Sequence, residues 1–490
     1  PALPVASRSA TVRDLSRRLL LTTARAPQGL GDSTELLRQR VSLLWAAGWA
    51  GDATALLRVV PPVAEHPALD AIRLDIQLAA GRHEDACTLA RNMRERQATP
   101  ALKKAAAFCL AMAGRTAQLD LYEQVLYADG IEDPAFFRLL AQLAGREPVE
   151  PVDLPSSAMS PLYLAMLQAT DRPPPDAALD GGSAAALRGL ALAPGAQPHL
   201  RAEAAELAAE RGILTLDELR QLYLSLPIAA ASEADPIAFA AEEPGALAAA
   251  ALYRAIANSQ NVEATLNLIE ETWRHARARG RSDVVARALR PHIEAVQPVE
   301  VLAVYAAVTM RVLLRGGAME AARGWFQELI RPARLGDPHA ASAVLELAPL
   351  IYAADAGEQV AAPAQALSIW WRAQNDAAGG HSPAERALVL AMLESLERPM
   401  PDALWADAIG PAPMAVGPLP SVAMARQFEQ AVAAGRKGET VLLALILLGN
   451  DGPQAVADTV LARIVSGLKR IGLNREAHAL ALESLLIRGF

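Results

Sequence analysis

Residues 71–90 read AIRLDIQLAAGRHEDACTLA, and this stretch holds the pattern that decides the fold. An alanine- and leucine-rich segment runs into Gly81, a few polar residues follow, and a second amphipathic segment begins at Asp85 and Ala86. A glycine can supply the positive φ angle that ends a helix, and the helix dipole favours an acid in the first turn of the next one. The pattern therefore predicts a helical hairpin. It recurs at Gly48-Asp52-Ala53, Gly316-Glu320-Ala321 and Gly472-Glu476-Ala477.

The glycines that end successive first helices are almost evenly spaced. Gly48, Gly81, Gly114 and Gly145 lie 33, 33 and 31 residues apart, close to the period of about 34 residues of one helix-turn-helix repeat. In this period and in its glycine-x3-acid-alanine turn, the chain resembles the tetratricopeptide repeat family. The large aromatic positions of that family are mostly Ala, Leu or Arg here, and the turn after Gly114 lacks the acid and the alanine. The individual repeats are thus degenerate, while the period is kept.

The resemblance implies an all-α, right-handed α-solenoid of antiparallel helix pairs. Prolines disfavour helix at and before their positions, so proline-rich segments are expected to connect the helical parts. The long segment before residue 421 carries Trp405 in its middle. The expected regions are an N-terminal tetratricopeptide-like array (1–146), a proline-rich connection (147–183), a helical segment (184–228), a connection (229–245), a second helical-repeat array (246–396), a proline-rich loop (397–420) and a C-terminal helical cap (421–490).

The composition excludes several classes of partner and environment. Hydrophobic residues make up 52% of the chain but aromatic residues only 4%, which favours closely packed helices rich in Ala, Leu and Val. The net charge of −8, with no basic tail, argues against nucleic acid as a partner. The longest apolar run, residues 441–448, is far shorter than the roughly 18–20 residues that span a bilayer. We therefore expect no transmembrane segment in this sequence.

Two cysteines bear on the compartment. Cys87 and Cys109 flank the turn at Thr99-Pro100 at nearly equal distances, so an antiparallel hairpin would bring them level. Buried free thiols and a disulfide bond both remain open. A disulfide would indicate an oxidising compartment, for which a bacterial periplasm is the expectation and the bacterial cytoplasm the alternative. The first residue is Pro1 rather than methionine, so we also expect a preceding piece, such as a signal peptide, to have been removed or left out.

The sequence shows no arrangement of residues that points to catalysis, a metal or a cofactor. The eight histidines are scattered singly, without an i, i+4 pair or an HExxH motif. His83, beside Glu84 and Asp85, is expected to be an exposed turn residue. There is no GxSxG elbow, no phosphate-binding GxxxxGK[ST] loop and no CxxC pair. We therefore predict a protein that is not an enzyme and has no metal or cofactor.

The family resemblance also points to candidate interaction residues, counted back along the first helices from the turn glycines. This lining is mixed, and it lacks the row of basic residues with which some family members hold a partner's C-terminal carboxylate. Trp45 and Trp49 are expected four apart on one helix. The arginines near Gly280 and the tryptophan of the long loop add further candidates. The candidate surface comprises Glu35, Arg38, Trp45, Lys104, Phe108, Met112, Arg274, Arg277, Arg281, Trp405, Lys469 and Arg470.

These observations predict a non-catalytic scaffold or adaptor that presents a concave helical-repeat surface to one or more protein partners. A bacterial envelope assembly is the narrower expectation. The alternative is a protein that binds or acts on peptidoglycan or another glycan on a helical superhelix. Here the seven Trp, seven Tyr and seven Phe are spread over 490 residues, whereas sugar sites usually gather exposed aromatics. A lipid carrier is a second alternative. The sequence does not specify the oligomeric state.

Overall fold

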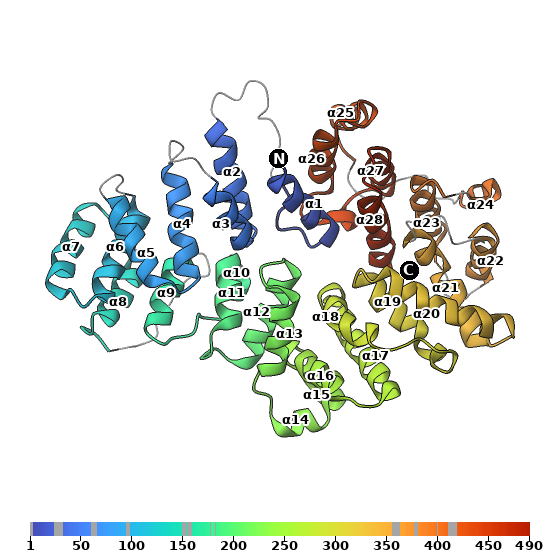
Figure 1. The fold of residues 1–490 in the computed structure, drawn as a ribbon, viewed down its shortest axis with the longest axis horizontal. Coiled ribbons are helices and arrows are strands. Elements are labelled where there is room, and N and C mark those ends of the chain that lie inside the picture. The colour runs from blue at the N-terminus through green and yellow to red at the C-terminus, as the bar shows by residue number, and fades with distance from the viewer. Residues whose placement is uncertain are drawn as a thin grey trace. The chain divides into compact units, whose positions relative to one another are not determined.

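In the computed structural model every regular element is a helix among the residues that it describes, which confirms the all-α class (Figure 1). The described residues are 3–23, 33–59, 66–94, 99–148, 154, 159–176, 178–181, 183–354, 363–376, 381–398, 400–409 and 419–490. The chain forms two compact units. Unit 1 comprises Pro1–Leu19, Ala229–Pro244 and Ala248–Phe490, and unit 2 comprises Leu20–Ile228 and Gly245–Leu247.

Unit 2 begins with three helical pairs in which each helix packs against the next (Figure 1). Local signals start several of these helices: Thr99 accepts a hydrogen bond from the backbone of Leu102 at the start of α6, and Asp133 accepts one from Phe136 at the start of α8. Proline follows both capping residues, where its fixed φ suits the first helical turn. The three pairs are α2 (Ser33–Ala46) with α3 (Ala50–Arg58), α4 (Pro67–Ala79) with α5 (His83–Arg94), and α6 (Pro100–Met112) with α7 (Thr116–Ala128), and α8 (Pro134–Leu143) follows them.

The turn glycines have the predicted backbone conformation in most of the hairpins. Gly48, Gly81 and Gly472 have φ angles of 82°, 69° and 81°, and the acid of each copy lies in the first turn of the following helix. The copy at Gly316 differs, because Gly316 keeps a helical φ of −72° and Gly317 takes the positive φ of 75°. Helix α19 (Ala306–Arg315) thus ends one residue later relative to the motif, and Glu320 is the second residue of the following helix, whereas the acid is the third residue in the other copies.

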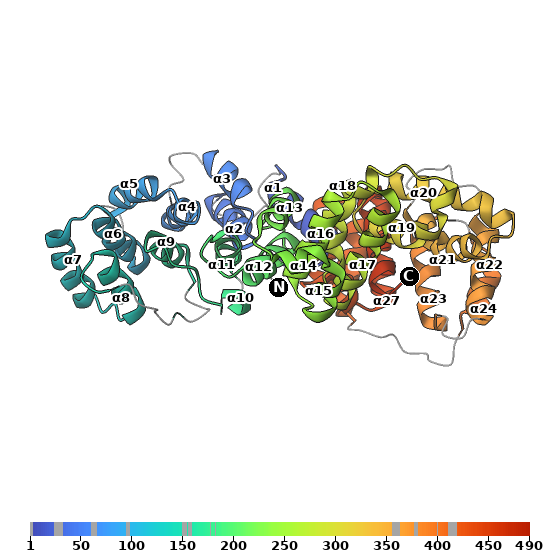
Figure 2. The same cartoon turned by 90° about the horizontal axis from the view of Figure 1, so that it is seen from below.

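After α8 the chain of unit 2 turns back along its own first half. Helix α9 (Pro161–Ala169) packs against both α8 and α4, and it lies beside α4 in Figure 1 and Figure 2. Helices α10 (Ala178–Gly181), α11 (Ala184–Leu192), α12 (Pro198–Glu210) and α13 (Leu216–Ser225) follow. The segment 147–183, predicted to be a connection, therefore contains two helices. Pro161 starts α9 rather than preventing it, because a proline at the first helical position removes no helical hydrogen bond.

Helices α9 to α13, which we call the returning half, cover the first two glycine turns but leave the third open. A Cβ atom added to Gly48 would lie 2.6 Å from Cγ1 of Ile213 and 2.8 Å from Cβ of Ala184, and one added to Gly81 would lie 3.5 Å from the Gln168 amide. The same addition at Gly114 would meet nothing within 4 Å. The Gly48 turn thus needs glycine for close packing as well as for φ, whereas a Cβ atom at Gly81 would make an ordinary van der Waals contact.

Unit 1 is also built from helices that pack mainly in chain order. The segment 229–245, predicted to be a connection, holds two short helices, and Asp402–Asp407 is helical within the predicted loop 397–420, of which residues 399 and 410–418 lie outside the described part. The elements are α14 (Ala230–Ala234), α15 (Pro236–Glu242), α16 (Ala246–Asn258), α17 (Val262–Ala278), α18 (Ser282–Glu294), the 3₁₀ helix η3 (Glu300–Tyr305), α19, α20 (Met319–Arg334), α21 (Pro338–Ala354), α22 (Pro363–Asp376), α23 (Pro383–Ser395), α24 (Asp402–Asp407), α25 (Val422–Ala433), α26 (Lys437–Leu448), the 3₁₀ helix η4 (Gly452–Ala455), α27 (Asp458–Arg470) and α28 (Asn474–Ile487).

The C-terminal helix is the centre of unit 1, and the N-terminal segment docks onto it. Helix α28 packs against α19, α21, α23 and α27. The carboxylate of Glu483 on α28 accepts hydrogen bonds from the backbone N–H groups of Ala10 at 3.1 Å and Thr11 at 3.2 Å, in the first turn of α1 (Ala10–Leu21). Arg18 pairs with Glu476, the acid of the last glycine motif. Residues up to 19 therefore belong to unit 1 rather than to the N-terminal array in which the sequence placed them.

Candidate interaction site

The twelve residues predicted to form an interaction surface divide between the two units, six in each. In unit 2, the charged ones pair with groups of their own unit. The guanidinium of Arg38 donates to the Glu35 carboxylate, with Nε 2.7 Å from Oε2. The ammonium of Lys104 pairs with Asp133, which also accepts a hydrogen bond from the hydroxyl of Tyr163. The first pair joins neighbouring turns of α2, and the second joins α6 to the residue that caps α8.

Trp45 belongs to a contact inside unit 2 as well. Its side chain hydrogen-bonds to the half-buried carboxylate of Asp75 on α4. Burial raises the pKa of Asp75 from 3.8 to about 6, and the hydrogen bond from Trp45 offsets part of this rise. Trp49 is not on the same helix as Trp45, contrary to the prediction, because α2 ends at Ala46 and Trp49 directly precedes α3. Trp49 is buried.

Two predictions about side-chain exposure are wrong in unit 2. Phe108 was expected on the surface, but it lies in the core with none of its area exposed. The His83 ring packs edge-on against it, with ring centroids 5.5 Å apart. His83 is half-buried at the start of α5 rather than exposed in the turn, and burial lowers its pKa. Counting back from Gly114 therefore identified an inward position of α6. Met112, at the end of the same helix, is exposed as predicted.

In unit 1 the predicted residues occupy separate helices. Arg274 on α17 pairs with Glu270 and Glu271, with nitrogen–oxygen distances of 3.2 and 2.6 Å. The side chain of Trp405 is half-buried on α24, a helix where a loop was expected. The remaining predicted residues lie at helix ends: Arg277 near the end of α17, Arg281 directly before α18, and Lys469 and Arg470 in the last turn of α27.

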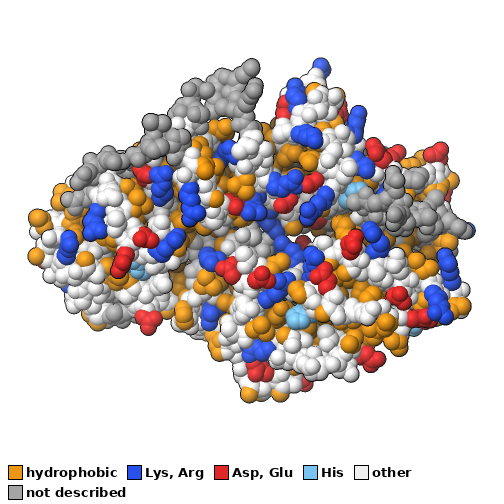
Figure 3. Space-filling view, viewed as in Figure 1, with side chains coloured by type: hydrophobic (Ala, Val, Ile, Leu, Met, Phe, Trp, Pro, Cys, Tyr) orange, Lys and Arg blue, Asp and Glu red, His pale blue; other side chains and the backbone are white. Residues whose placement is uncertain are grey.

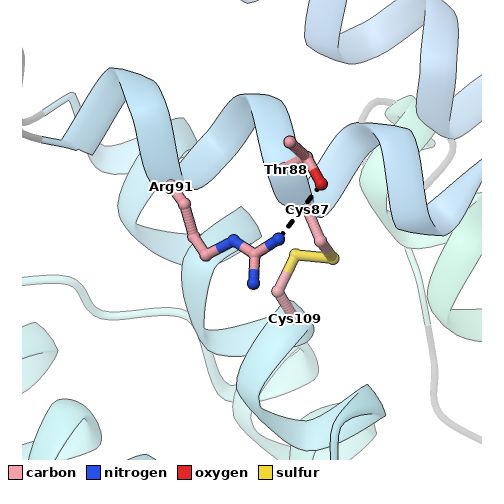
Figure 4. The surroundings of a disulfide bond; sticks show 4 residues. All are labelled: Cys87, Thr88, Arg91 and Cys109. Atoms are coloured by element: carbon pink, nitrogen blue, oxygen red, sulfur yellow. Dashed lines mark hydrogen bonds between the residues drawn. A yellow bond between two sulfur atoms is a disulfide. The ribbon is translucent and has the colours of Figure 1, made fainter.

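The two cysteines are joined by a disulfide bond in the structure. Cys87 lies on α5 and Cys109 on α6, with Cα atoms 5.5 Å apart (Figure 4). Near the bond, Arg91 donates a hydrogen bond to the hydroxyl of Thr88 at 3.1 Å (Figure 4). Since α5 belongs to the second helical pair and α6 to the third, the disulfide links two successive pairs of the array.

Helix α7 of unit 2 exposes apolar side chains on one face. Its inward side chains, Leu119 and Leu126, are fully buried, whereas Leu121 is 65% exposed and Val125 43% exposed on another face. Hydrophobic side chains reach the surface over α7 at the left edge of Figure 3. Positions spaced i, i+4, i+7, i+8 and i+11 lie on one face of a helix. All five residues at this spacing are exposed, and we call them the α7 stripe: Ala117, Leu121, Gln124, Val125 and Ala128.

The topology of unit 2 explains why the α7 stripe is uncovered. Helix α6 is the main helical neighbour of α7 among the described residues. The next helix, α8, packs against α6 and α9, and it meets α7 through the stacked rings of Phe137 and Tyr127, whose centroids are 4.4 Å apart. Helix α9 then returns to α4 instead of adding another helix beside α7. The stripe is therefore an exposed face of α7.

Sequence reasoning missed this stripe because it followed the family's first-helix positions. The stripe lies on a second helix, after a turn that lacks the acid and the alanine of the motif. The signal was present in the sequence, since α7 carries uncharged residues on one face while Leu119 and Leu126 already supply an inward face. Nothing in the sequence indicated that the outer face would stay uncovered, because this depends on the return of α9 to α4.

Comparison of the chain with models of known protein families, with curated proteins and with solved structures finds no match. Within the described ranges no helix has both the length and the apolar character needed to cross a membrane. The described residues also contain no group of three or more His, Cys, Asp and Glu side chains placed to hold a metal ion. The geometry of the candidate site is thus the basis for the functional assignment.

Proposed function

We propose that the protein is a non-catalytic scaffold or adaptor, and that the α7 stripe binds an amphipathic helix of a partner protein. The observation that carries this proposal is the exposure of Leu121 and Val125 on a helix whose inward face is already filled. Partner helices commonly bind to an exposed row of apolar residues at helical spacing.

The small residues at both ends of the stripe support a helix as the occupant. Ala117 and Ala128 leave room for close approach of a second backbone, while Leu121 and Val125 supply the central apolar contacts. The charges nearest the stripe are already compensated, because Arg146 pairs with both Asp120 and Glu123 of α7 at 2.8 and 2.7 Å. A partner helix with an uncharged apolar face therefore fits better than a strongly acidic or basic one.

The partner helix would take the place of the next second helix of the array. In this proposal α2 to α7 form a short right-handed array of tetratricopeptide-like hairpins, and the partner extends the layer of α3, α5 and α7. The Cys87–Cys109 disulfide supports an oxidising compartment for this assembly, such as a bacterial periplasm. It would also hold the third pair, which bears the stripe, against the second.

The proposal is tested by affinity purification of three forms of the full chain from native cells. The forms are wild type, the double variant L121Q/V125Q, and L224Q as a matched control, since Leu224 on α13 is also an exposed leucine of unit 2. Glutamine keeps helix propensity, so the double variant should stay folded. We expect a partner retained by wild type and L224Q and lost by L121Q/V125Q. Identical recovery with all three forms, or turnover of peptidoglycan by the wild type, would contradict the proposal.

A further inference from the structure

A surface hollow of about 500 Å³ lies within unit 1, between η3, the last turns of α20 and the start of α21. Its apolar wall consists of Val301, Ala303, Val304 and Pro332, and its polar wall consists of Glu300, Asp337 and His339. This hollow is separate from the α7 stripe, which belongs to unit 2, and it plays no part in the function proposed above.

The apolar wall is unusually open for side chains of this type. Val301 is 78% exposed and Val304 is 65% exposed. In a 3₁₀ helix, residues three apart lie almost directly above one another, so these two valines form one ridge. Val299, directly before η3, and Leu335, at the end of α20, are exposed as well. Isolated exposed valines need no explanation, but a ridge beside a hollow indicates a binding surface.

The charges of the lining favour a ligand with a cationic group. Two carboxylates, Glu300 and Asp337, line the hollow, and its lining contains no Lys or Arg. A guanidinium nitrogen of Arg331 lies 3.5 Å from a carboxylate oxygen of Glu300, but the Arg331 side chain is largely exposed. Ion pairs on the surface contribute little to stability. Oδ1 of Asp337 accepts hydrogen bonds from the backbone N–H groups of His339 at 2.9 Å and Ala340 at 3.0 Å. These bonds fix the carboxylate at the rim of the hollow. A cationic group beside an apolar one is therefore the complementary ligand.

We propose that this hollow docks a protein segment in which an apolar side chain lies next to lysine or arginine. The apolar side chain packs on the Val301–Val304 ridge, and the cation meets Glu300 and Asp337, replacing Arg331 at Glu300. A second copy of the chain is a poorer occupant, because a two-fold interface places the same patch of each copy face to face and would bring the carboxylates of Glu300 and Asp337 toward their own copies. An anionic partner would be repelled by the rim.

The test uses the full chain and two fluorescein-labelled peptides that share two central leucines, one flanked by lysines and the other by glutamates. Fluorescence anisotropy should show the lysine peptide binding at least tenfold more tightly than the glutamate peptide, with the difference shrinking as salt rises. The V301Q/V304Q variant should bind the lysine peptide at least tenfold more weakly than the wild type does, and E300Q should bind it severalfold more weakly. V262Q is the matched control, since Val262 is an exposed valine of α17 outside the hollow, and it should leave binding unchanged.

Three outcomes would overturn the inference. The first is no binding of either peptide, and the second is equal binding of both. The third is a V301Q/V304Q protein that binds as the wild type does while retaining the wild-type circular dichroism spectrum. Sedimentation velocity on the same variants tests the second-copy alternative: a wild-type dimer that V301Q/V304Q converts to a monomer would assign the ridge to self-association instead. The peptide-binding and sedimentation results do not depend on whether a partner helix binds the α7 stripe.

Discussion

The first and third glycine turns of unit 2 share one backbone conformation but lie in different surroundings. Gly48 and Gly114 have φ angles of 82° and 64°. Gly48 is packed against Ile213 and Ala184 of the returning half, whereas a Cβ at Gly114 would meet no atom within 4 Å. A glycine with a positive φ angle thus ends a helix in both places but packs against the returning half only in the first. The surroundings of the third pair are open, and the α7 stripe beside it is exposed.

Alanine substitution should separate these two roles, and it gives the largest expected effect. G114A adds only the strain of a positive φ angle, which costs roughly 1–2 kcal/mol. G48A adds the same strain and also forces the new methyl group against Ile213 and Ala184, so we expect a total loss of roughly 2–5 kcal/mol. Chemical denaturation of both variants measures the difference. Equal losses would show that the returning half does not pack on the first turn as described.

The disulfide links a covered pair to the open one, so breaking it should affect the two unequally. The C87S/C109S variant should lose roughly 3 kcal/mol, the value for closing a loop of this size. The extra opening should concentrate in α6 and α7, because α4 is also held by α9. Hydrogen exchange should show faster exchange over residues 100–128 than over 67–79. Two reactive thiols in the denatured native protein, or uniform acceleration across unit 2, would contradict this expectation.

The pH dependence of stability should differ between an acid of the covered pairs and one beside the open pair. The folded pKa of Asp75, about 6, lies above its ordinary value of 3.8, so the native state binds the extra proton and stability falls as pH rises from about 4 to 6. D75N should therefore gain roughly 1–2 kcal/mol at pH 8 and nothing at pH 3.5. Urea denaturation at both pH values provides the measurement. A gain of the same size at both would exclude ionisation of Asp75 as its cause.

Asp133, next to α6, supplies the opposite case. Burial would raise the pKa of its carboxyl, but hydrogen bonds from Lys104, Tyr163 and the Phe136 backbone outweigh burial, and the net pKa is lowered. Its stabilising contribution is present above the ordinary pKa and disappears as pH falls through the folded value. D133N should therefore be destabilising at pH 8 and less so in acid, which makes it the matched control for D75N.

The smallest stability effect is expected at the α7 stripe itself. L121Q and V125Q remove exposed apolar side chains without opening a cavity, so the free energy of unfolding should change by no more than about 0.5 kcal/mol. Leu126 directly follows Val125 on the same helix but is fully buried. L126Q should therefore lower the free energy of unfolding strongly. Thermal unfolding of the three variants checks this contrast. A large loss in L121Q would show that the stripe is covered in solution.

The sequence predicted the helical class, the hairpin period and most of the glycine turns, because these follow from local rules of helix termination. It did not predict that prolines such as Pro161 start helices, or that α9 would turn back onto α4. The start of α9 at Pro161 follows a local rule of helix initiation, whereas the return of α9 onto α4 depends on contacts between residues distant in the chain. The same limitation explains Phe108: its place in a repeat was visible, but which side of α6 would face the core was fixed by packing around the disulfide and His83.

Site-specific photo-crosslinking from the α7 stripe tests the central claim most directly. A photoreactive amino acid is placed at position 121 or 125, with position 224 as the control, and the crosslinked partner residues are mapped by mass spectrometry. If a partner helix binds the stripe, one partner segment should be captured, with crosslinked residues spaced three or four apart as on a helix face, and position 224 should capture little. Equal capture from position 224, or partner residues at alternating spacing as in a strand, would contradict it.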